Sequence, residues 1–251
     1  MIHRKASALP DLLAKIQRRV TGIAARIVKA APYDFDKSNP LGSNGERVDI
    51  QLDHRIRFEK LDIYQKSHWK RYKFALSLVE AGDVCGDFAC GTGYGSVMLS
   101  EKARAVVGVD IDAHVIDAIR RRYKKNKKVT FVRESILDLT FVDHFDKIIS
   151  FETIEHFQKD DIMKLLAIFG RALKRNGRLI LSTPFMQEED GAAARLAFHQ
   201  TFGIHEGTLR SWLGNAGFQI ELLKYQNYET HTLGDDQAKK DFIICVASKH
   251  V

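Results

Sequence analysis

The segment from Val84 to Gly95 places a short apolar run, which ends in an acid, directly before three glycines with the spacing G-x-G-x-G. A glycine turn lets the backbone pass close to a ligand where a Cβ atom would collide. A second apolar run, residues 105–109, ends at Asp110. In an open α/β sheet, such a turn and an acid at the end of the next strand hold a nucleoside by its ribose hydroxyls. The two features together predict a nucleoside-binding α/β sheet.

The glycine segment differs from a dinucleotide-binding fingerprint at two positions. Ser96 stands where G-x-G-x-x-G requires its third glycine, and Asp87 lies four residues before the first glycine. A carboxylate there would repel a pyrophosphate but suits a ligand with a positive end, such as S-adenosylmethionine with its ammonium and sulfonium groups. A glycine loop that merely packs a helix onto a sheet is the alternative interpretation, and the second acid at Asp110 argues against it.

In these residues the chain resembles the class I S-adenosylmethionine-dependent methyltransferases, whose first motif reads (D/E)-x-x-x-G-x-G-x-G. Four later parts extend the resemblance in order, and it covers about residues 60–249: residues 131–138, 145–156, 171–184 and the paired runs 218–222 and 242–246. The resemblance implies S-adenosylmethionine as cofactor, with contacts from Asp87, Ala89, Cys90, Gly91, Gly93, Asp110, Ile111, Ser135, Ile136, Phe151, Glu152 and Arg71. The family often has Asp where this chain has Ser135, which weakens the contact expected with the adenine amino group.

A narrower resemblance rests on Ser67–Tyr72 together with the strings ACGTGYGS, SFETIEH and STP. This combination is similar to methyltransferases encoded with bacterial surface-polysaccharide or glycolipid genes, although related sequences also methylate quinones and small metabolites. It implies a role in polysaccharide biosynthesis and a small-molecule, sugar or lipid-linked acceptor, and it favours O-methylation.

Apolar runs and helical stretches alternate from Val84 onward, which predicts a doubly wound α/β sheet. The resemblance implies a Rossmann-like, mostly parallel, seven-stranded sheet with an antiparallel C-terminal hairpin and helices on both faces. Strands are expected near 84–88, 105–109, 129–133, 146–151, 177–183, 218–225 and 242–248, and helices near 60–81, 95–103, 113–124, 160–174 and 206–216. The pair Asn176-Gly177 is a helix-stop signal.

The chain is expected to divide into a basic amphipathic helix over 1–31, a linker over 32–59 and a methyltransferase domain over 60–251. Residues 1–32 carry seven cations and one acid, which is +6 of the net +7, so the body is nearly neutral and does not favour nucleic acid. A basic amphipathic helix can pack on its own domain, dock on a partner or lie on an anionic membrane. These alternatives stay open. We expect a cytoplasmic protein, with peripheral inner-membrane contact through residues 9–29 as one option.

Methyl transfer from a sulfonium is an in-line displacement, so the protein supplies position and a proton acceptor. A sugar hydroxyl needs a base, and a neutral histidine suits that role near pH 7. His156 follows the fourth predicted strand, at the carboxyl edge of the sheet, and is the predicted base; a histidine that supports the next helix is the alternative. The predicted acceptor-binding residues are Tyr64, His68, Tyr72 and His199. Because no adjacent acid pair follows that strand, no metal is predicted.

Two other functions stay open at this point. One is an RNA or protein methyltransferase that docks through the basic run 120–128, although this run offers Tyr123 as its one aromatic residue for stacking. The other is a cofactor-binding scaffold without catalysis. The oligomeric state does not follow from the sequence.

Overall fold

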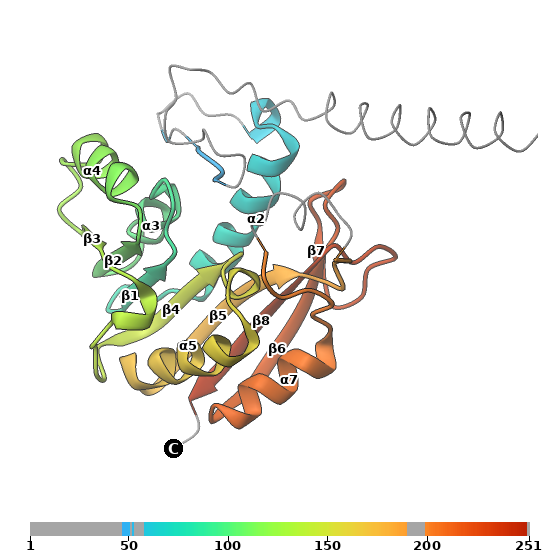
Figure 1. Cartoon of the computed structure of the whole chain (residues 1–251). Coiled ribbons are helices and arrows are strands. Elements are labelled where there is room, and N and C mark those ends of the chain that lie inside the picture. The colour runs from blue at the N-terminus through green and yellow to red at the C-terminus, as the bar shows by residue number, and fades with distance from the viewer. Residues whose placement is uncertain (1–46, 51, 53–57, 190–198, 250–251) are drawn as a thin grey trace, which may run out of the picture. The chain divides into compact units, whose positions relative to one another are not determined.

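The computed structural model describes residues 47–50, 52, 58–189 and 199–249 (Figure 1). The predicted helix over residues 1–31 and most of the predicted linker over 32–59 lie outside the described residues. In the part of the chain that is described, no helix has the length and apolar character needed to cross a membrane.

Eight strands form one sheet within the described residues, in the order β3-β2-β1-β4-β5-β8-β6-β7. The strands are β1 (Val84–Phe88), β2 (Ala105–Asp110), β3 (Val129–Arg133), β4 (Phe145–Phe151), β5 (Leu173–Pro184), β6 (Phe218–Gln226), β7 (Leu233–Gly234) and β8 (Phe242–Lys249). The first five are parallel, and β8 runs antiparallel between β5 and β6. The predicted mostly parallel sheet with an antiparallel C-terminal hairpin is confirmed. The short edge strand β7 is the eighth strand, which the sequence did not predict.

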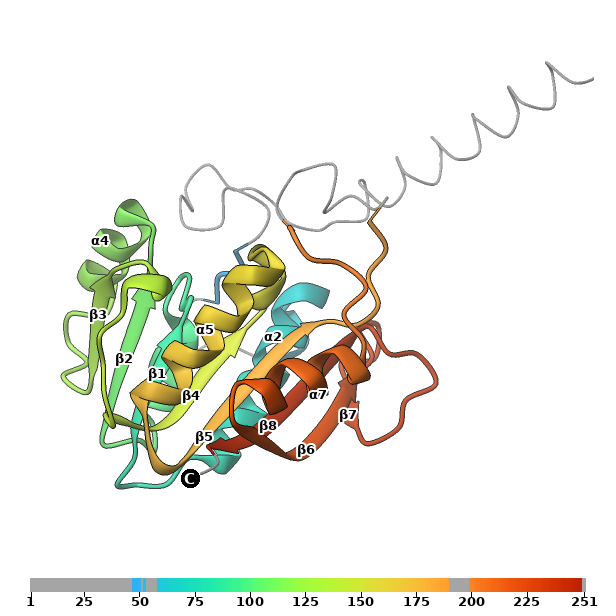
Figure 2. The ribbon, with the colours of Figure 1, turned by 60° about the horizontal axis from the view of Figure 1, so that its bottom comes forward.

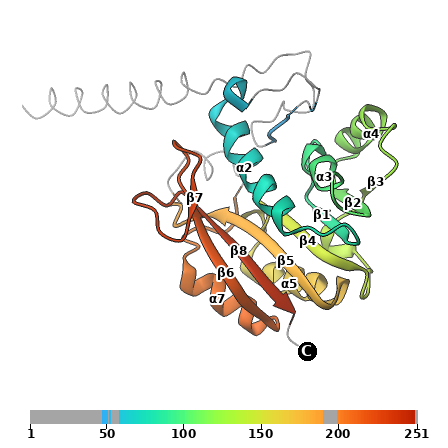
Figure 3. The ribbon, with the colours of Figure 1, turned by 180° about the vertical axis from the view of Figure 1, so that it is seen from behind.

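Helices cover both faces of this sheet, as predicted. α5 (Lys159–Ala172) and α7 (Glu206–Asn215) lie on one face, and α2 (Ile63–Leu78) lies on the other (Figures 2 and 3). Both faces of the sheet can hold helices because successive side chains along a strand point to opposite faces. Ile148 packs in the cluster that contains α5 and α7, whereas its neighbour Ile149 packs with α2 and α3 (Tyr94–Leu99). α4 (Ala113–Arg122) packs against Phe131 of β3.

The start of α2 is fixed by a capping box. The Asp62 side chain accepts a hydrogen bond from Gln65 N at 2.8 Å, and the Gln65 side chain accepts from Asp62 N at 3.0 Å. Gln65 Nε2 also donates to Asp49 O at 2.8 Å. The cap therefore satisfies two N-terminal amides of the helix and ties the helix to the segment that precedes it.

The third glycine of the motif is needed for the packing of α2 on α3. A Cβ atom at Gly95 would collide with the ring of Tyr72. That ring is buried and lies edge-on to Tyr94 and Phe151, with centroids 5.3 and 5.0 Å away. Tyr72 can reach the glycine turn because position 95 lacks a side chain.

The prediction that Asn176-Gly177 is a helix-stop signal, after the helix expected near 160–174, is wrong. α5 ends at Ala172, and β5 begins at the next residue. Asn176 lies inside β5 with a φ of +66°, near a register shift between β4 and β5. Asparagine tolerates this left-handed conformation well, so the pair marks a strand irregularity and not a helix stop.

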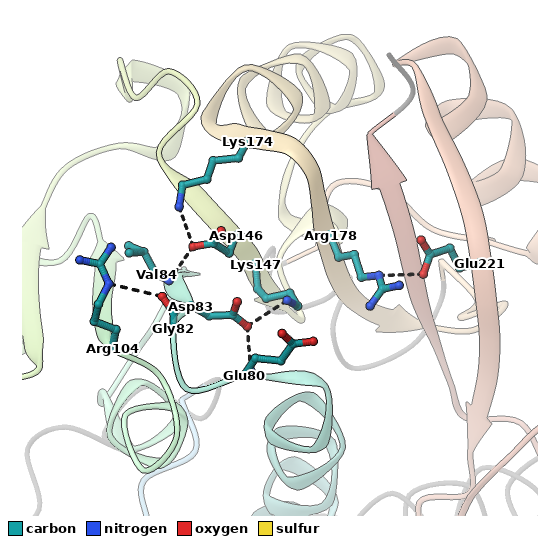
Figure 4. A network of polar contacts seen from close by, with 10 residues as sticks. All are labelled: Glu80, Gly82, Asp83, Val84, Arg104, Asp146, Lys147, Lys174, Arg178 and Glu221. Atoms are coloured by element: carbon teal, nitrogen blue, oxygen red, sulfur yellow. Dashed lines mark hydrogen bonds and ion pairs between the residues drawn. The ribbon is translucent and has the colours of Figure 1, made fainter.

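A polar network ties the amino ends of β1 and β4 together (Figure 4). Lys147 Nζ lies 2.9 Å from Asp83 Oδ2, which also accepts from Glu80 N at 2.8 Å. Asp146 accepts from Val84 N at 2.8 Å and forms a second ion pair with Lys174. These contacts lie at the opposite edge of the sheet from the carboxyl ends of the same strands.

Candidate functional site

A pocket of about 300 Å³ opens at the carboxyl ends of β1, β2, β3 and β4. Ligands of doubly wound sheets bind at this edge. The predicted site residues that line the pocket are His68, Tyr72, Ala89, Cys90, Gly91, Asp110, Ile111, Ser135, Ile136, Phe151, Glu152 and His156. The predicted residues that do not line it are Asp87, Gly93, Arg71, Tyr64 and His199. The sequence therefore located most of the wall, and the remaining residues lie behind it or beside it.

Asp110 ends β2 at the wall of the pocket and is 7% exposed. Its Oδ2 accepts from Gly91 N at 2.9 Å, and its Oδ1 accepts from Asp112 N at 3.0 Å. Each carboxylate oxygen keeps further acceptor capacity. The glycine turn and the acid predicted to act together are thus joined by a direct hydrogen bond.

Asp87 lies behind the pocket wall with no exposed surface. Its carboxylate accepts from Ser96 Oγ at 2.6 Å and from the Tyr72 hydroxyl at 3.0 Å. Desolvation raises the pKa of this carboxyl to about 6, and the two hydrogen bonds oppose that rise. In this structure Asp87 supports the glycine turn and α2 from below.

Ser135 begins the short 3₁₀ helix η2 (Ile136–Asp138), and its hydroxyl accepts from Leu137 N at 3.2 Å. Ile136 is buried, whereas Ile111 is 67% exposed at the rim of the pocket. Two aliphatic side chains on neighbouring loops can cover the faces of a flat ring.

Arg71 is completely buried in α2, and its guanidinium stacks over the Phe242 ring at 4.4 Å. Nη1 donates to Gln226 Oε1 at 3.0 Å and lies 3.8 Å from Glu152 Oε1. Nε and Nη2 make no hydrogen bond within the described residues. Buried guanidinium donors are rarely left in this state, so they are available to an anionic group.

Glu152 follows β4 with a φ of +50°, in the left-handed region. Its N–H donates to Ser182 O at 3.0 Å, and its Oε1 accepts from Ser182 Oγ at 2.7 Å. A non-glycine residue held in this conformation costs energy, which is consistent with a functional loop.

Glu155, His156 and His199 come together beside the pocket, with one possible ligand atom from each within 4.8 Å of the others. The His156 and His199 rings lie edge-on with centroids 5.0 Å apart. Desolvation, followed by the charge of His156, lowers the pKa of His199 to about 4. Burial, followed by the nearby Glu152, raises the pKa of Glu155. The sequence could not show that His199 lies beside His156, because they belong to loops after different strands.

The other predicted acceptor-binding residues divide into two groups. His68 and Tyr72 face the pocket from α2. Enclosure of the His68 ring, followed by the charge of Arg71, lowers the pKa of His68 well below its usual range. Tyr64 lies one turn earlier on the helix, 37% exposed, and packs edge-on against Tyr228 at 5.2 Å. The structure therefore places Tyr64 away from the pocket.

The sequence missed several lining residues, of which Arg47 and Val48 are the most informative. Both belong to the stretch predicted as a linker. Val48 is buried, and its carbonyl accepts from Thr92 Oγ1 at 3.0 Å, while Arg47 lies 3.1 Å from Asp112. Apolar residues in an irregular segment carry no periodic pattern, so their burial was not predictable. Thr92, Tyr94, Glu134, Thr153 and Phe157 complete the lining.

The basic run 120–128 makes contacts within its own domain. The Arg120 guanidinium donates to Phe131 O, and Arg122 forms a two-bonded pair with Asp49 at 2.7 and 3.0 Å. Lys128 Nζ donates to Ser100 O and Ala103 O. These three cations therefore hold parts of their own domain together, whereas the other cations of the run, Arg121, Lys124, Lys125 and Lys127, are exposed.

Part of the chain is similar to known methyltransferases. Residues 86–177 match the family model of the methyltransferase domain. An S-adenosylmethionine-dependent methyltransferase of Mycolicibacterium smegmatis is 28% identical over 134 residues, which is 53% of this chain and 50% of the relative. The demethylmenaquinone methyltransferase of Tropheryma whipplei is 30% identical over 122 residues, 48% of this chain and 50% of the relative. The chain thus spans about half the length of the curated relatives it matches.

Among solved structures, a complex between the Haloferax volcanii Trm112 methyltransferase activator and its methyltransferase partner matches with a TM-score of 0.62 at 20% identity. The match covers 73% of this chain and 91% of that one, and it shows the fold. The family model and the curated relatives thus agree in describing this part of the chain as similar to methyltransferases, and the Mycolicibacterium smegmatis relative is named as dependent on S-adenosylmethionine. The segment from Gly86 to Gly177 thus matches the model of a methyltransferase domain, and it lies within a fold of the class I, Rossmann-like type.

Proposed function

We propose that this protein transfers the methyl group of S-adenosylmethionine to a hydroxyl group of a small molecule, a sugar or a lipid-linked sugar. The observation that carries the proposal is the joined pair of Asp110 and Gly91 at the wall of the pocket. A carboxylate held in this way is positioned to accept from two ribose hydroxyls, while the glycine turn leaves room for the amino acid portion of the ligand.

Residues of the pocket would also contact the adenine ring and the methionine portion of S-adenosylmethionine. Ile111 and Ile136 would cover the adenine ring, and the backbone of Ala89–Gly91 would lie beside the methionine portion. Arg71, buried behind Glu152, would act on the methionine portion indirectly, by holding the Glu152 carboxylate in place. Of the predicted cofactor residues, Asp87 and Gly93 would act on the shape of the turn from behind the wall.

The acceptor would bind between the cofactor and the side chains of His68 and His156. Both line the pocket, and burial keeps His68 neutral at physiological pH. His156 is our candidate for the group that removes the hydroxyl proton as the oxygen attacks. Three cations of the basic run, Arg120, Arg122 and Lys128, are engaged in contacts within the domain, which reduces the charge that the run could offer to RNA.

The test of the cofactor site is calorimetric titration of the purified chain with S-adenosylmethionine, S-adenosylhomocysteine and NAD. We expect binding of the first two, and we expect Asp110→Ala to weaken it at least about tenfold, since a hydrogen bond to a charged group contributes roughly 1.5–3 kcal/mol. Asp117→Ala, on the exposed side of α4, is the matched control. A response to NAD alone, or equal affinity in Asp110→Ala, would contradict the proposal.

The acceptor class is tested by transfer of labelled methyl groups into fractionated cell extract. Label in a lipid, glycan or small-molecule fraction supports the proposal, and label in RNA or protein supports the rival function. Binding of S-adenosylmethionine without label in any fraction would identify a non-catalytic scaffold.

A further inference from the structure

Glu155, His156 and His199 form a cluster that the fold itself assembles. Glu155 and His156 belong to the 3₁₀ helix η3 (Ile154–His156) after β4, and His199 belongs to the segment after β5. The two segments are joined through the backbone: Gln200 N donates to Glu155 O at 2.8 Å, and Thr201 Oγ1 donates to Phe157 O at 2.7 Å. The three side chains therefore meet at a fixed place next to the pocket and not on a free surface.

Glu155 carries one carboxylate oxygen that no group satisfies within the described residues. The residue is 1% exposed, and its Oε2 accepts from Thr183 Oγ1 at 3.0 Å. Its Oε1 is buried and accepts no hydrogen bond. A buried carboxylate oxygen without a partner is costly, and a cation is one partner that removes the cost.

One ring nitrogen of His199 forms a hydrogen bond, and the other can bind a metal ion. Its Nδ1 lies 2.6 Å from Gln187 Oε1. Because that oxygen can only accept, Nδ1 carries the proton, and Nε2 keeps its lone pair. A histidine that binds a metal commonly donates its other ring N–H in this way, and a ligating carboxylate is commonly hydrogen-bonded, as Glu155 is by Thr183.

We propose that Glu155, His156 and His199 together bind one divalent first-row transition-metal ion, of the class represented by Zn²⁺. Two imidazole nitrogens and one carboxylate oxygen suit such an ion, whereas Mg²⁺ and Ca²⁺ prefer oxygen ligands alone. Three protein ligands leave a further coordination position, as in catalytic zinc sites. The sequence predicted no metal because no adjacent pair of acids follows the fourth predicted strand. A site made of two histidines and one acid does not contain such a pair.

The role of the ion rests on the proposed function. The acceptor hydroxyl would occupy the further position, where the ion lowers the pKa of the hydroxyl and its proton passes to solvent. The bound oxygen then forms its bond to the methyl carbon as the carbon–sulfur bond breaks, and neutral S-adenosylhomocysteine leaves. In the metal-bound protein His156 would act on the acceptor through the ion, and this role replaces the removal of the hydroxyl proton that is proposed for His156 without a metal.

The experiment is calorimetric titration of the untagged full chain, stripped with a chelator, with ZnCl₂ and separately with MgCl₂. We expect Zn²⁺ to bind and Mg²⁺ not to compete. Glu155→Gln and His199→Ala should each weaken Zn²⁺ binding more than tenfold, because even outer-shell changes at metal sites cost 10–100-fold. His114→Ala removes an exposed histidine on α4 and should leave the affinity unchanged. Circular dichroism verifies that each variant is folded.

Co²⁺ supplies a second measurement that does not depend on activity, because its visible absorption reports nitrogen and oxygen ligation. The Co²⁺ spectrum should disappear in His199→Ala and persist in His114→Ala. Absence of Zn²⁺ binding, or equal binding in wild type and His199→Ala, would overturn the proposal. S-adenosylmethionine is titrated separately, so loss of the metal site and loss of the cofactor site are distinguishable results.

Discussion

Asp87 is a buried acid whose protonation is coupled to folding. Its side chain has no exposed surface, and desolvation raises its pKa from 3.8 to about 6. Because the folded pKa is the higher one, the folded state binds more protons than the unfolded state between about pH 4 and pH 6. The contribution of Asp87 to stability therefore falls as pH rises through this window, by an amount on the order of 3 kcal/mol.

We expect Asp87→Asn to remove this part of the pH dependence, since the amide has no proton to lose. Urea unfolding of wild type and variant at several pH values from 4 to 7 measures the effect. Asp117→Asn, an exposed acid on α4, serves as the control. Parallel stability curves for wild type and Asp87→Asn would show that the buried carboxyl titrates near its ordinary pKa.

The strands β1 and β4 depend on a buried ion pair at their amino ends. Lys147 and Asp83 are each 7% exposed, and their charged atoms lie 2.9 Å apart (Figure 4). We expect Lys147→Met to lower the free energy of unfolding by about 3 kcal/mol or more, because it leaves Asp83 buried without its cation. Urea denaturation gives the value.

The double variant Asp83→Asn with Lys147→Met is the control for this element. It removes both charges, so it should be clearly more stable than Lys147→Met alone. If the double variant loses as much free energy of unfolding as the two single variants together, Asp83 and Lys147 do not stabilise each other, and the prediction is contradicted. Affinity for S-adenosylmethionine should stay unchanged in either case, since the network lies at the edge opposite the pocket.

The elements that could be predicted were those with a clear local sequence pattern. β1, β2 and β4 are short apolar runs bounded by turn residues, and their places were predicted to within a residue or two. The end of α5 was not, because Asn176-Gly177 is equally compatible with a strand irregularity. β7 pairs through two residues and has no pattern of its own.

At the scale of the whole molecule, some features of the site follow from a local motif, whereas others arise only when distant segments of the chain come together. Asp110 and Gly91 were predictable because a motif fixes their spacing along the chain. The meeting of His156 with His199 depends on backbone contacts between two loops, and the burial of Val48 depends on α2 and α3. Tertiary packing determines such contacts, and a single sequence carries no local signal for them.

Removal of residues 1–31 is a test of domain independence. The described core is closed from residue 47 onward, since Val48 and Ile50 are buried in the cluster that contains Tyr72 and Tyr94. We therefore expect the truncated chain to fold with an unchanged melting temperature and unchanged affinity for S-adenosylmethionine. Thermal melting and calorimetry measure both. A lower melting temperature would show that the segment belongs to the core.

β8 lies between β5 and β6 in the sheet, although it follows both of them in the chain. Two long strands are thus synthesised before the one that joins them. Until Phe242–Lys249 is synthesised, each keeps a row of unpaired backbone groups that can recruit another nascent polypeptide. A premature stop just before residue 242 would therefore leave the facing edges of β5 and β6 unpaired and give an aggregation-prone product.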